Sequence, residues 1–375
     1  MKITKNYIKI WILSALTFSI LLCAINYFID PYKYYHQAPG TRELTGFEQS
    51  HKTWQVKMRQ PDTVIMGNSR TLYGFDASLL EGDKPFNYSF PGPTIEEVEK
   101  QFESLLYMTK VKKVYIVTDR ICALSKVSTR NLSNLFNNDL EMLKAEIGRA
   151  KYLLSINTLI TSLKSLSKPV FYDNYGRRIS FVFGKQSGVT LSERVQIREG
   201  YSLKRESSEN NHCDTSVFER LLTKGHENNV NITLLLNPVH VRHIYIDSLT
   251  SADSNIYENM KVKLVKINRK IAEELEVKPY PIYDFNVINE YTTEKFEMST
   301  NKEPEFWWES SHYKKALGDK VLDWINAKKP ERNSGIGAEI TSSNINKHNE
   351  IQKIKLDGWI ASHPKVTEEI RALVH

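Results

Sequence analysis

The sequence predicts an α/β fold with a mainly parallel sheet, placed behind a single N-terminal transmembrane helix. Short apolar runs typical of buried strands alternate with longer stretches of helical periodicity, beginning at residues 64–66. Strands that alternate with helices in this rhythm pair in parallel through right-handed crossovers. With 375 residues, 41% of them hydrophobic and 25% charged, the chain is long enough for one large α/β domain with additions.

The transmembrane helix is predicted at residues 10–29, an uncharged apolar run of 20 residues that just spans a hydrocarbon core. Three lysines precede this run and favour a cytoplasmic N-terminus. No A-x-A-like cleavage site follows it, and the bulky Leu22 argues against lipoprotein processing at Cys23. We therefore expect a retained single-pass anchor, with the rest of the chain on the outer side of the membrane.

We expect residues 31–58 to form an irregular linker and residues 59–327 to form the α/β domain. The first strand of this domain ends at Gly67-Asn68-Ser69. Glycine adopts backbone angles that a Cβ resists, and asparagine tolerates them next best, so the turn can expose Ser69 at the carboxyl end of the strand. Open α/β sheets place their chemistry at this edge. Ser69 is therefore the candidate nucleophile, against the alternative of an ordinary turn serine.

The next elements continue the alternation of strand and helix. A second strand is predicted at residues 85–90. Thr94 and Glu97 form a capping box that opens a helix through about Thr109, and a third strand is predicted at residues 111–118. These elements bring a second strand end to the edge that carries Ser69.

Residues 125–205 are expected to form an insertion that covers one edge of the site. Helical stretches are predicted near residues 140–147 and 152–166, followed by a loop from 172 to 201. A connection of this length inside a compact domain is usually functional or mobile.

Regular structure then resumes. We expect helix 216–226, strand 231–236, helix 257–275, strand 281–285 and helix 316–325. From residue 328 to 375 the chain is polar, with a short helical stretch from Val366, and no fold requirement is evident for this tail.

A serine hydroxyl needs a base to take its proton and a carboxylate to orient that base. Only residues 306–313 offer both together, with Glu309 and His312 three positions apart. In a turn, this spacing can bring the carboxylate to one imidazole nitrogen and leave the other facing Ser69. We interpret Ser69, His312 and Glu309 as a catalytic triad, against the alternative of a surface histidine and a solvated carboxylate.

Three short motifs in this order resemble the SGNH (GDSL-like) hydrolase superfamily. Within it they are similar to the membrane-anchored members that handle acyl groups on bacterial exopolysaccharides and cell-wall polymers. The motifs, spread over about residues 60–325, are Gly67-Asn68-Ser69-Arg70, the stretch from Asn87 to Gly92, and Glu309-Ser310-Ser311-His312. The resemblance implies a three-layer α/β/α, flavodoxin-like domain in the periplasm, anchored in a bacterial inner membrane.

The resemblance also implies that the backbone amides of Ser69 and Gly92 hold the oxyanion formed on attack. The family's third donor, an asparagine after the next strand, is missing here, because residues 117–120 read Val-Thr-Asp-Arg. Asn237, at the end of a later strand, is the candidate replacement, against the alternative of a turn residue. The family usually carries aspartate where Glu309 stands, although the extra methylene still reaches the imidazole.

Arg70, Asp119 and His240 are candidates for contact with substrate, since each stands just after a predicted strand. For Arg70 an ion pair inside the fold, with Asp119 or Asp76, is favoured over substrate binding. His240 and His243 lack a partner with coordinating spacing, so no metal is expected. The sequence contains neither a Gly-x-Gly-x-x-Gly fingerprint nor a P-loop, so no cofactor is expected.

The net charge is +7, but the lysines are scattered and form no basic tract interleaved with aromatic residues, which disfavours nucleic acid as a partner. Attraction to an anionic membrane or an acidic glycan accounts for the charge equally well. Cys23 lies in the apolar segment. Cys122 and Cys213 therefore either form a disulfide outside the cytosol or remain buried thiols.

Two functions remain open at this stage. One is an esterase or O-acyltransferase for acyl groups, acetyl above all, of a bacterial polysaccharide, with an integral-membrane acyltransferase as a partner. The other is a catalytically degenerate SGNH fold that binds glycan or serves as a scaffold subunit. The departures at Glu309 and at the missing asparagine keep the second function open.

Overall fold

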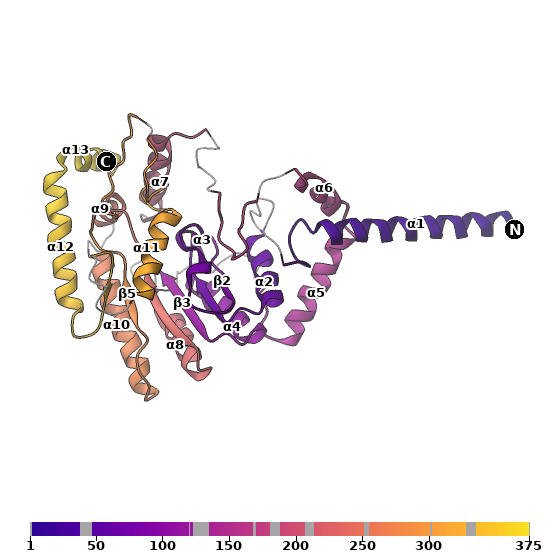
Figure 1. The fold of residues 1–375 in the computed structure, drawn as a ribbon, viewed down its shortest axis with the longest axis horizontal. Coiled ribbons are helices and arrows are strands. Elements are labelled where there is room, and N and C mark those ends of the chain that lie inside the picture. Colours follow the sequence, from indigo (N-terminus) through magenta and orange to yellow (C-terminus); the bar gives the residue numbers. More distant parts are fainter. Residues whose placement is uncertain are drawn as a thin grey trace.

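The computed structural model describes residues 2–37, 47–119, 121–122, 135–167, 170–180, 188–206, 214–250, 255–300, 302–327 and 335–374. The centre of this described part is a six-stranded sheet in the order β2-β1-β3-β4-β5-β6 (Figure 1). The strands are β1 (Thr63–Met66), β2 (Pro85–Asn87), β3 (Lys113–Thr118), β4 (Asn231–Leu236), β5 (Ile282–Asp284) and β6 (Ala338–Glu339). Only β5 and β6 pair antiparallel. The prediction of an α/β fold with a mainly parallel sheet is confirmed.

Both faces of the sheet are buried. Alternate residues of each strand point to opposite faces. Along β3, Val114 and Ile116 belong to one apolar cluster, whereas Tyr115 and Val117 belong to another. Parallel strands buried on both faces read as continuous apolar runs. This is why the sequence located β1, β3 and β4 to within two residues at their ends.

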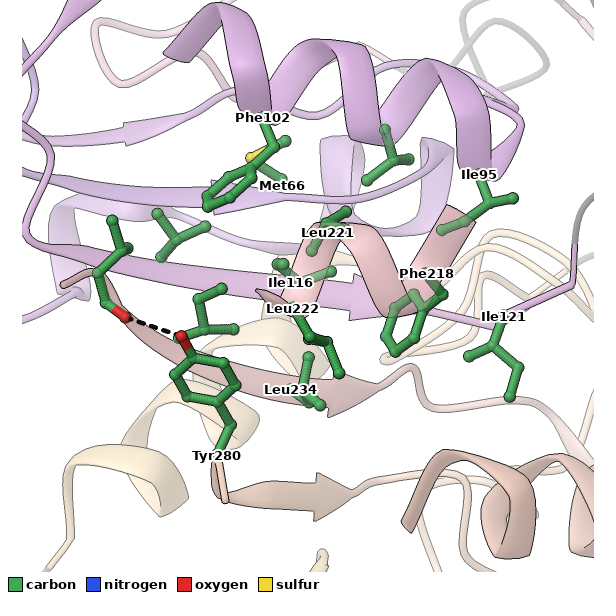
Figure 2. Packing of buried hydrophobic residues seen from close by; sticks show 14 of the residues in the cluster. Met66, Ile95, Phe102, Ile116, Ile121, Phe218, Leu221, Leu222, Leu234 and Tyr280 are labelled. Carbon is green, nitrogen blue, oxygen red and sulfur yellow. Dashed lines mark hydrogen bonds between the residues drawn. The ribbon is translucent and has the colours of Figure 1, made fainter. Parts of the chain in front are cut away.

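Three helices cover the first face of the sheet: α4 (Ile95–Met108), α8 (Ser216–Glu227) and α10 (Ile256–Glu274). Figure 2 shows Phe102 of α4 and Leu221 of α8 packed among side chains of the strands, including Ile116. The predicted capping box is present, with Thr94 and Glu97 each accepting from the other's backbone N–H.

The second face is covered by the helix α11 (Lys315–Asn326) and the 3-10 turn η1 (Ala77–Leu79). Leu317, Val321 and Trp324 of α11 supply its buried side chains. A short helix, α3 (Ser69–Gly74), starts directly after β1 and contacts α11. The turn at Gly67-Asn68-Ser69, called the nucleophile turn below for its candidate residue Ser69, therefore lies between the sheet and α11.

Residues 31–58 are not only an irregular linker, because they contain most of the helix α2 (Glu48–Arg59). Polar side chains on this helix are buried: Lys52 Nζ donates to Asn87 O at 2.7 Å, and a ring nitrogen of His51 lies 2.9 Å from Tyr32 O. A helix that buries satisfied polar groups shows no apolar stripe, so periodicity could not locate it.

The predicted insertion contains α5 (Asp139–Leu153) and α6 (Ile156–Ser165), close to the expected positions. The loop expected at residues 172–201 is wrong in its second half, where the chain forms α7 (Leu191–Glu206). The helix α9 (Val241–Thr250) was not predicted either. Its first seven residues are all buried, so this stretch has no exposed polar face and its sequence shows no helical alternation of apolar and polar residues.

The tail is part of the fold rather than an addition to it. It contains β6 at the sheet edge and the helices α12 (Ile345–Ser362) and α13 (Pro364–Val374). Trp359 and Ile370 pack with residues of α9, and Gln352 Oε1 accepts from Ile288 N at 2.8 Å. The mostly polar composition concealed these few buried anchors.

At the other end of the molecule, α1 (Lys2–Ile29) extends from the body as a single rod (Figure 1). Its stretch Asn6–Ile29 is long and apolar enough to cross a membrane. Cys122 is disulfide-bonded and Cys23 is free, so the alternative of a buried free thiol is wrong for Cys122. The expected partner, Cys213, lies outside the described residues.

Candidate functional site

The nucleophile turn lies where β1 ends. Gly67 does not have a positive φ, so the expectation of a strained backbone there is wrong. Glycine is needed because a Cβ at this position would lie 2.3 Å from Thr71 Oγ1 and 2.8 Å from Val117 O. Asn68 then caps α3, its Oδ1 accepting from Arg70 N at 3.0 Å. This arrangement makes Ser69 the first residue of the helix.

His312 and Glu309, the candidate base and acid, lie on a loop whose two ends pair with each other. Trp307 and Tyr313 form an antiparallel bridge, and Trp308 N donates to His312 O at 2.8 Å. Inside the loop, the Glu309 carboxylate accepts from the backbone N–H groups of Ser311 and His312, at 2.6 and 3.2 Å. These two hydrogen bonds hold the buried Glu309 carboxylate in place independently of its contact with the imidazole.

Folding brings the two distant motifs together. Ser69 Oγ lies 2.8 Å from His312 Nε2, although the two residues are 243 positions apart. The other ring nitrogen, Nδ1, is hydrogen-bonded to Glu309 Oε1. The expected contacts among Ser69, His312 and Glu309 are therefore present, and the glutamate side chain reaches the imidazole ring.

The charges around the site favour a neutral imidazole next to an ionised carboxylate. Burial lowers the pKa of His312; Glu309 opposes this shift, while Arg198 and Arg70 add to it. Burial alone would raise the pKa of Glu309, but the His312 imidazole and then Arg198 outweigh burial and lower it. His312 is thus in the form that accepts a proton at neutral pH.

Arg70 links the ends of β1 and β3 to the loop that carries Glu309 and His312. Its Nη1 lies 3.0 Å from Asp119 Oδ2, and its Nε and Nη2 donate to Ser311 Oγ at 3.2 and 2.9 Å. Asn68 Nδ2 also donates to Asp119. The ion pair with Asp119 is confirmed, whereas Asp76 pairs with Lys315. The geometry gives Arg70 and Asp119 a positioning role, and a contact of either residue with substrate stays a prediction.

The second motif runs alongside the nucleophile turn. The strand β2 ends earlier than predicted, at Asn87, but Phe90 N still donates to Gly67 O at 3.1 Å. Asn87 Nδ2 donates to the carbonyls of Thr71 and Phe75, both at 3.0 Å, which fastens α3. Gly92 follows with φ of +53°, a conformation that favours glycine.

Asn237 supports the residue next to the base. Its Oδ1 accepts from Tyr313 OH at 2.8 Å, and its buried Nδ2 has no hydrogen-bond partner in the described part of the chain. Tyr313 in turn packs so closely on Gly74 that a Cβ there would lie 1.9 Å from the ring. The observed bond is to Tyr313, and the oxyanion role of Asn237 stays a prediction.

His240, a candidate for substrate contact, is buried and bonded within the fold. Its Nδ1 accepts from Arg242 N at 3.3 Å, its Nε2 contacts Glu294 O at 2.9 Å, and its ring stacks on Phe296. Burial lowers the pKa of His240 to about 3, so it is a neutral core residue. The nearby His243 is also buried, and within the described residues no group of three potential metal ligands forms.

Sequence reasoning missed Arg198, which α7 brings to the triad. It contributes to the pKa values of both Glu309 and His312, and its buried Nε has no hydrogen-bond partner within the residues that the structure describes. One turn earlier, Arg194 is fully engaged by Glu303 and by Trp308 O. The only available signal was the i, i+4 spacing of the two arginines in a polar stretch.

No protein-family model, curated protein or solved structure matches this chain. The functional assignment therefore depends on the geometry of the site and on the motifs described above.

Proposed function

We propose that this chain is a serine esterase or O-acyltransferase of SGNH type, with a three-layer α/β/α domain and the triad Ser69, His312 and Glu309. The hydrogen bond from Ser69 Oγ to His312 Nε2 at 2.8 Å carries the proposal. Three groups in the order nucleophile, base and orienting acid are what acyl transfer through a covalent intermediate requires.

In the first half-reaction Ser69 Oγ attacks an ester carbonyl while His312 Nε2 takes the hydroxyl proton. The tetrahedral intermediate then collapses, the bond to the leaving alcohol breaks, and His312 returns the proton to that alcohol. In the second half, His312 deprotonates water or a sugar hydroxyl, which attacks the acyl-serine; the bond from the acyl carbon to Ser69 Oγ breaks, and His312 returns the proton to Oγ. Water gives an esterase, and a sugar hydroxyl gives an acyltransferase.

The negative oxygen of the tetrahedral intermediate needs preorganised donors. We assign this role to the backbone N–H groups of Ser69 and Gly92, with the unpartnered Nδ2 of Asn237 as the third candidate. The N–H of Ser69 is at the start of a helix, and Gly92 follows the segment that is bonded to the nucleophile turn.

The proposed setting is the outer face of a bacterial inner membrane, with a polysaccharide as substrate and an integral-membrane acyltransferase as partner. Two observations support an extracytoplasmic location. Cys122 is disulfide-bonded, and disulfides persist mainly in oxidising compartments. The apolar helix α1 is long enough to serve as the anchor.

The test uses the purified full chain in detergent with a chromogenic acetyl ester, alone and with an added oligosaccharide acceptor. We expect turnover that disappears in Ser69→Ala and persists in the control Ser343→Ala, an exposed serine in the tail. An increase in acetylated oligosaccharide at the expense of free acetate identifies transfer. Binding of glycan without any turnover in the unmodified chain would contradict the proposal and favour the degenerate, glycan-binding scaffold.

A further inference from the structure

The base of α1 is surrounded by exposed apolar side chains on two other helices. On α5 and α6 these residues recur at three- and four-residue spacing, so each helix has an apolar stripe on its outer face. The exposed fraction is 46% or more for every one of Leu140, Leu143, Ile147, Leu154, Ile156, Ile160 and Leu163. The surfaces of soluble proteins rarely expose so many large apolar side chains in one region.

The length of α1 indicates what covers these stripes. On its last turns, Leu22 and Asn26 are buried where α1 contacts α5 and α6, whereas Ile25 and Phe28 are exposed like the apolar residues before Leu22. Residues 10–21 measure only about 18 Å at 1.5 Å per residue, against about 30 Å for a hydrocarbon core. The last turns of α1 are therefore also needed to complete a span. Because α6 packs on those turns, it lies at the same depth.

The polar side chain of Asn26 can lie at this depth because its amide is hydrogen-bonded within the chain. Its Nδ2 donates to the carbonyls of Leu153 and Ser155, at 2.9 and 3.1 Å, and its Oδ1 accepts from Ser162 Oγ at 3.2 Å. Helix ends leave carbonyls without partners, and such groups are costly in hydrocarbon. The amide of Asn26 is thus hydrogen-bonded to the turn between α5 and α6 and to α6, through both its donor and its acceptor atoms.

We propose that α6 and the adjoining end of α5 lie in the outer leaflet of the bilayer, packed against α1, with their apolar stripes facing lipid. Figure 1 shows α5 running steeply across the axis of α1, and α6 lying beside the base of α1. The exposed Lys151 and Lys164 are then placed to reach lipid headgroups. The domain is held against the membrane in one orientation instead of hanging on a flexible tether.

The test measures the depth of α6 in the full chain reconstituted into phosphatidylcholine nanodiscs. A nitroxide is attached at Ile160→Cys in a Cys23→Ala background, which leaves no free thiol in the described part of the chain. The matched control is Ile354→Cys, which is 64% exposed on α12 at the far end of the molecule. Collisions with oxygen, which concentrates in lipid, are compared with collisions with a water-soluble nickel complex.

We expect the ratio of oxygen to nickel collisions to be several-fold higher at position 160 than at position 354. A label at Leu163→Cys repeats the measurement where the first label disturbs packing. Equal nickel access at positions 160 and 354 would overturn the proposal, because α6 would then lie in water. Protection from both reagents would also overturn it, because a protein, such as an integral-membrane partner or a second copy, would then cover the stripe.

Discussion

The candidate site around Ser69 and His312 and the base of α1 both bury polar groups, but the hydrogen-bonding of these groups differs. At the base of α1, Asn26 spends its amide donor and acceptor on partners within the chain. At the candidate site, Ser69 Oγ is hydrogen-bonded to His312, and the buried Nε of Arg198 has no hydrogen-bond partner within the described residues. A structural polar group is satisfied by the fold, whereas a functional one keeps hydrogen-bonding capacity for a ligand or a reaction.

The largest effect is expected from removing the base. We predict that His312→Ala lowers kcat for an acetyl ester on the order of 10⁶-fold, because the triad acts as a unit. His363→Ala, in the tail, is the matched control and should leave kcat unchanged. Steady-state turnover with comparable thermal unfolding in all variants makes the comparison. A decrease below tenfold in His312→Ala would mean that the imidazole is not the base.

Substitutions at Glu309 test whether its carboxylate orients the imidazole of His312. We expect Glu309→Gln to lower kcat about 10⁴-fold, because an amide can hold His312 in the wrong tautomer. Glu309→Asp should retain more activity than Glu309→Gln, since the charge remains while the reach shortens by one methylene. The opposite order of the two variants in kcat would show that the charge of Glu309 does not matter.

At the base of α1 the expected effect is on stability. Asn26→Leu leaves the Leu153 carbonyl and the buried Ser162 hydroxyl without their Asn26 partner, which should cost about 1–3 kcal/mol of unfolding free energy. Thermal unfolding of the reconstituted full chain measures it, and turnover below the transition should hardly change. Thr17→Val, on the exposed part of α1, is the control. Equal stability of both variants would mean that the junction of α1, α5 and α6 does not contribute.

The smallest expected effect is a shift in pH dependence. Burial and the nearby arginines lower the pKa of His312, so activity should persist below the usual pKa of histidine and fall as pH drops through the lowered value. Arg198→Gln removes a positive charge and should raise this pKa, moving the acidic limb of kcat/KM to higher pH. Arg269→Gln, exposed on α10, should leave the limb in place. A limb that moves to lower pH in Arg198→Gln would contradict the assigned electrostatics.

The sequence predicted those parts that depend on local patterns. An apolar run followed by Gly67 located β1 and its turn, and the three-residue spacing of Glu309 and His312 located the catalytic loop. The structure also confirmed the ion pair of Arg70 with Asp119.

The parts that were missed depend on contacts between distant segments. The helix α2 buries charged and amide side chains such as Lys52, so it has no apolar stripe, and the tail is held by a few residues such as Trp359. Nothing near Arg198 in the sequence connects it with Glu309, because only the packing of α7 brings the two together. The burial of His240 was missed for the same reason, since its partners include Glu294, 54 positions away.

The activation of Ser69 by His312 can be tested directly with a fluorophosphonate, which forms a covalent adduct only with an activated serine. We predict one adduct per chain, mapped by mass spectrometry to Ser69, and a strong decrease in labelling rate in His312→Ala. An unlabelled chain, or an adduct at another serine that forms equally fast in His312→Ala, would contradict the account.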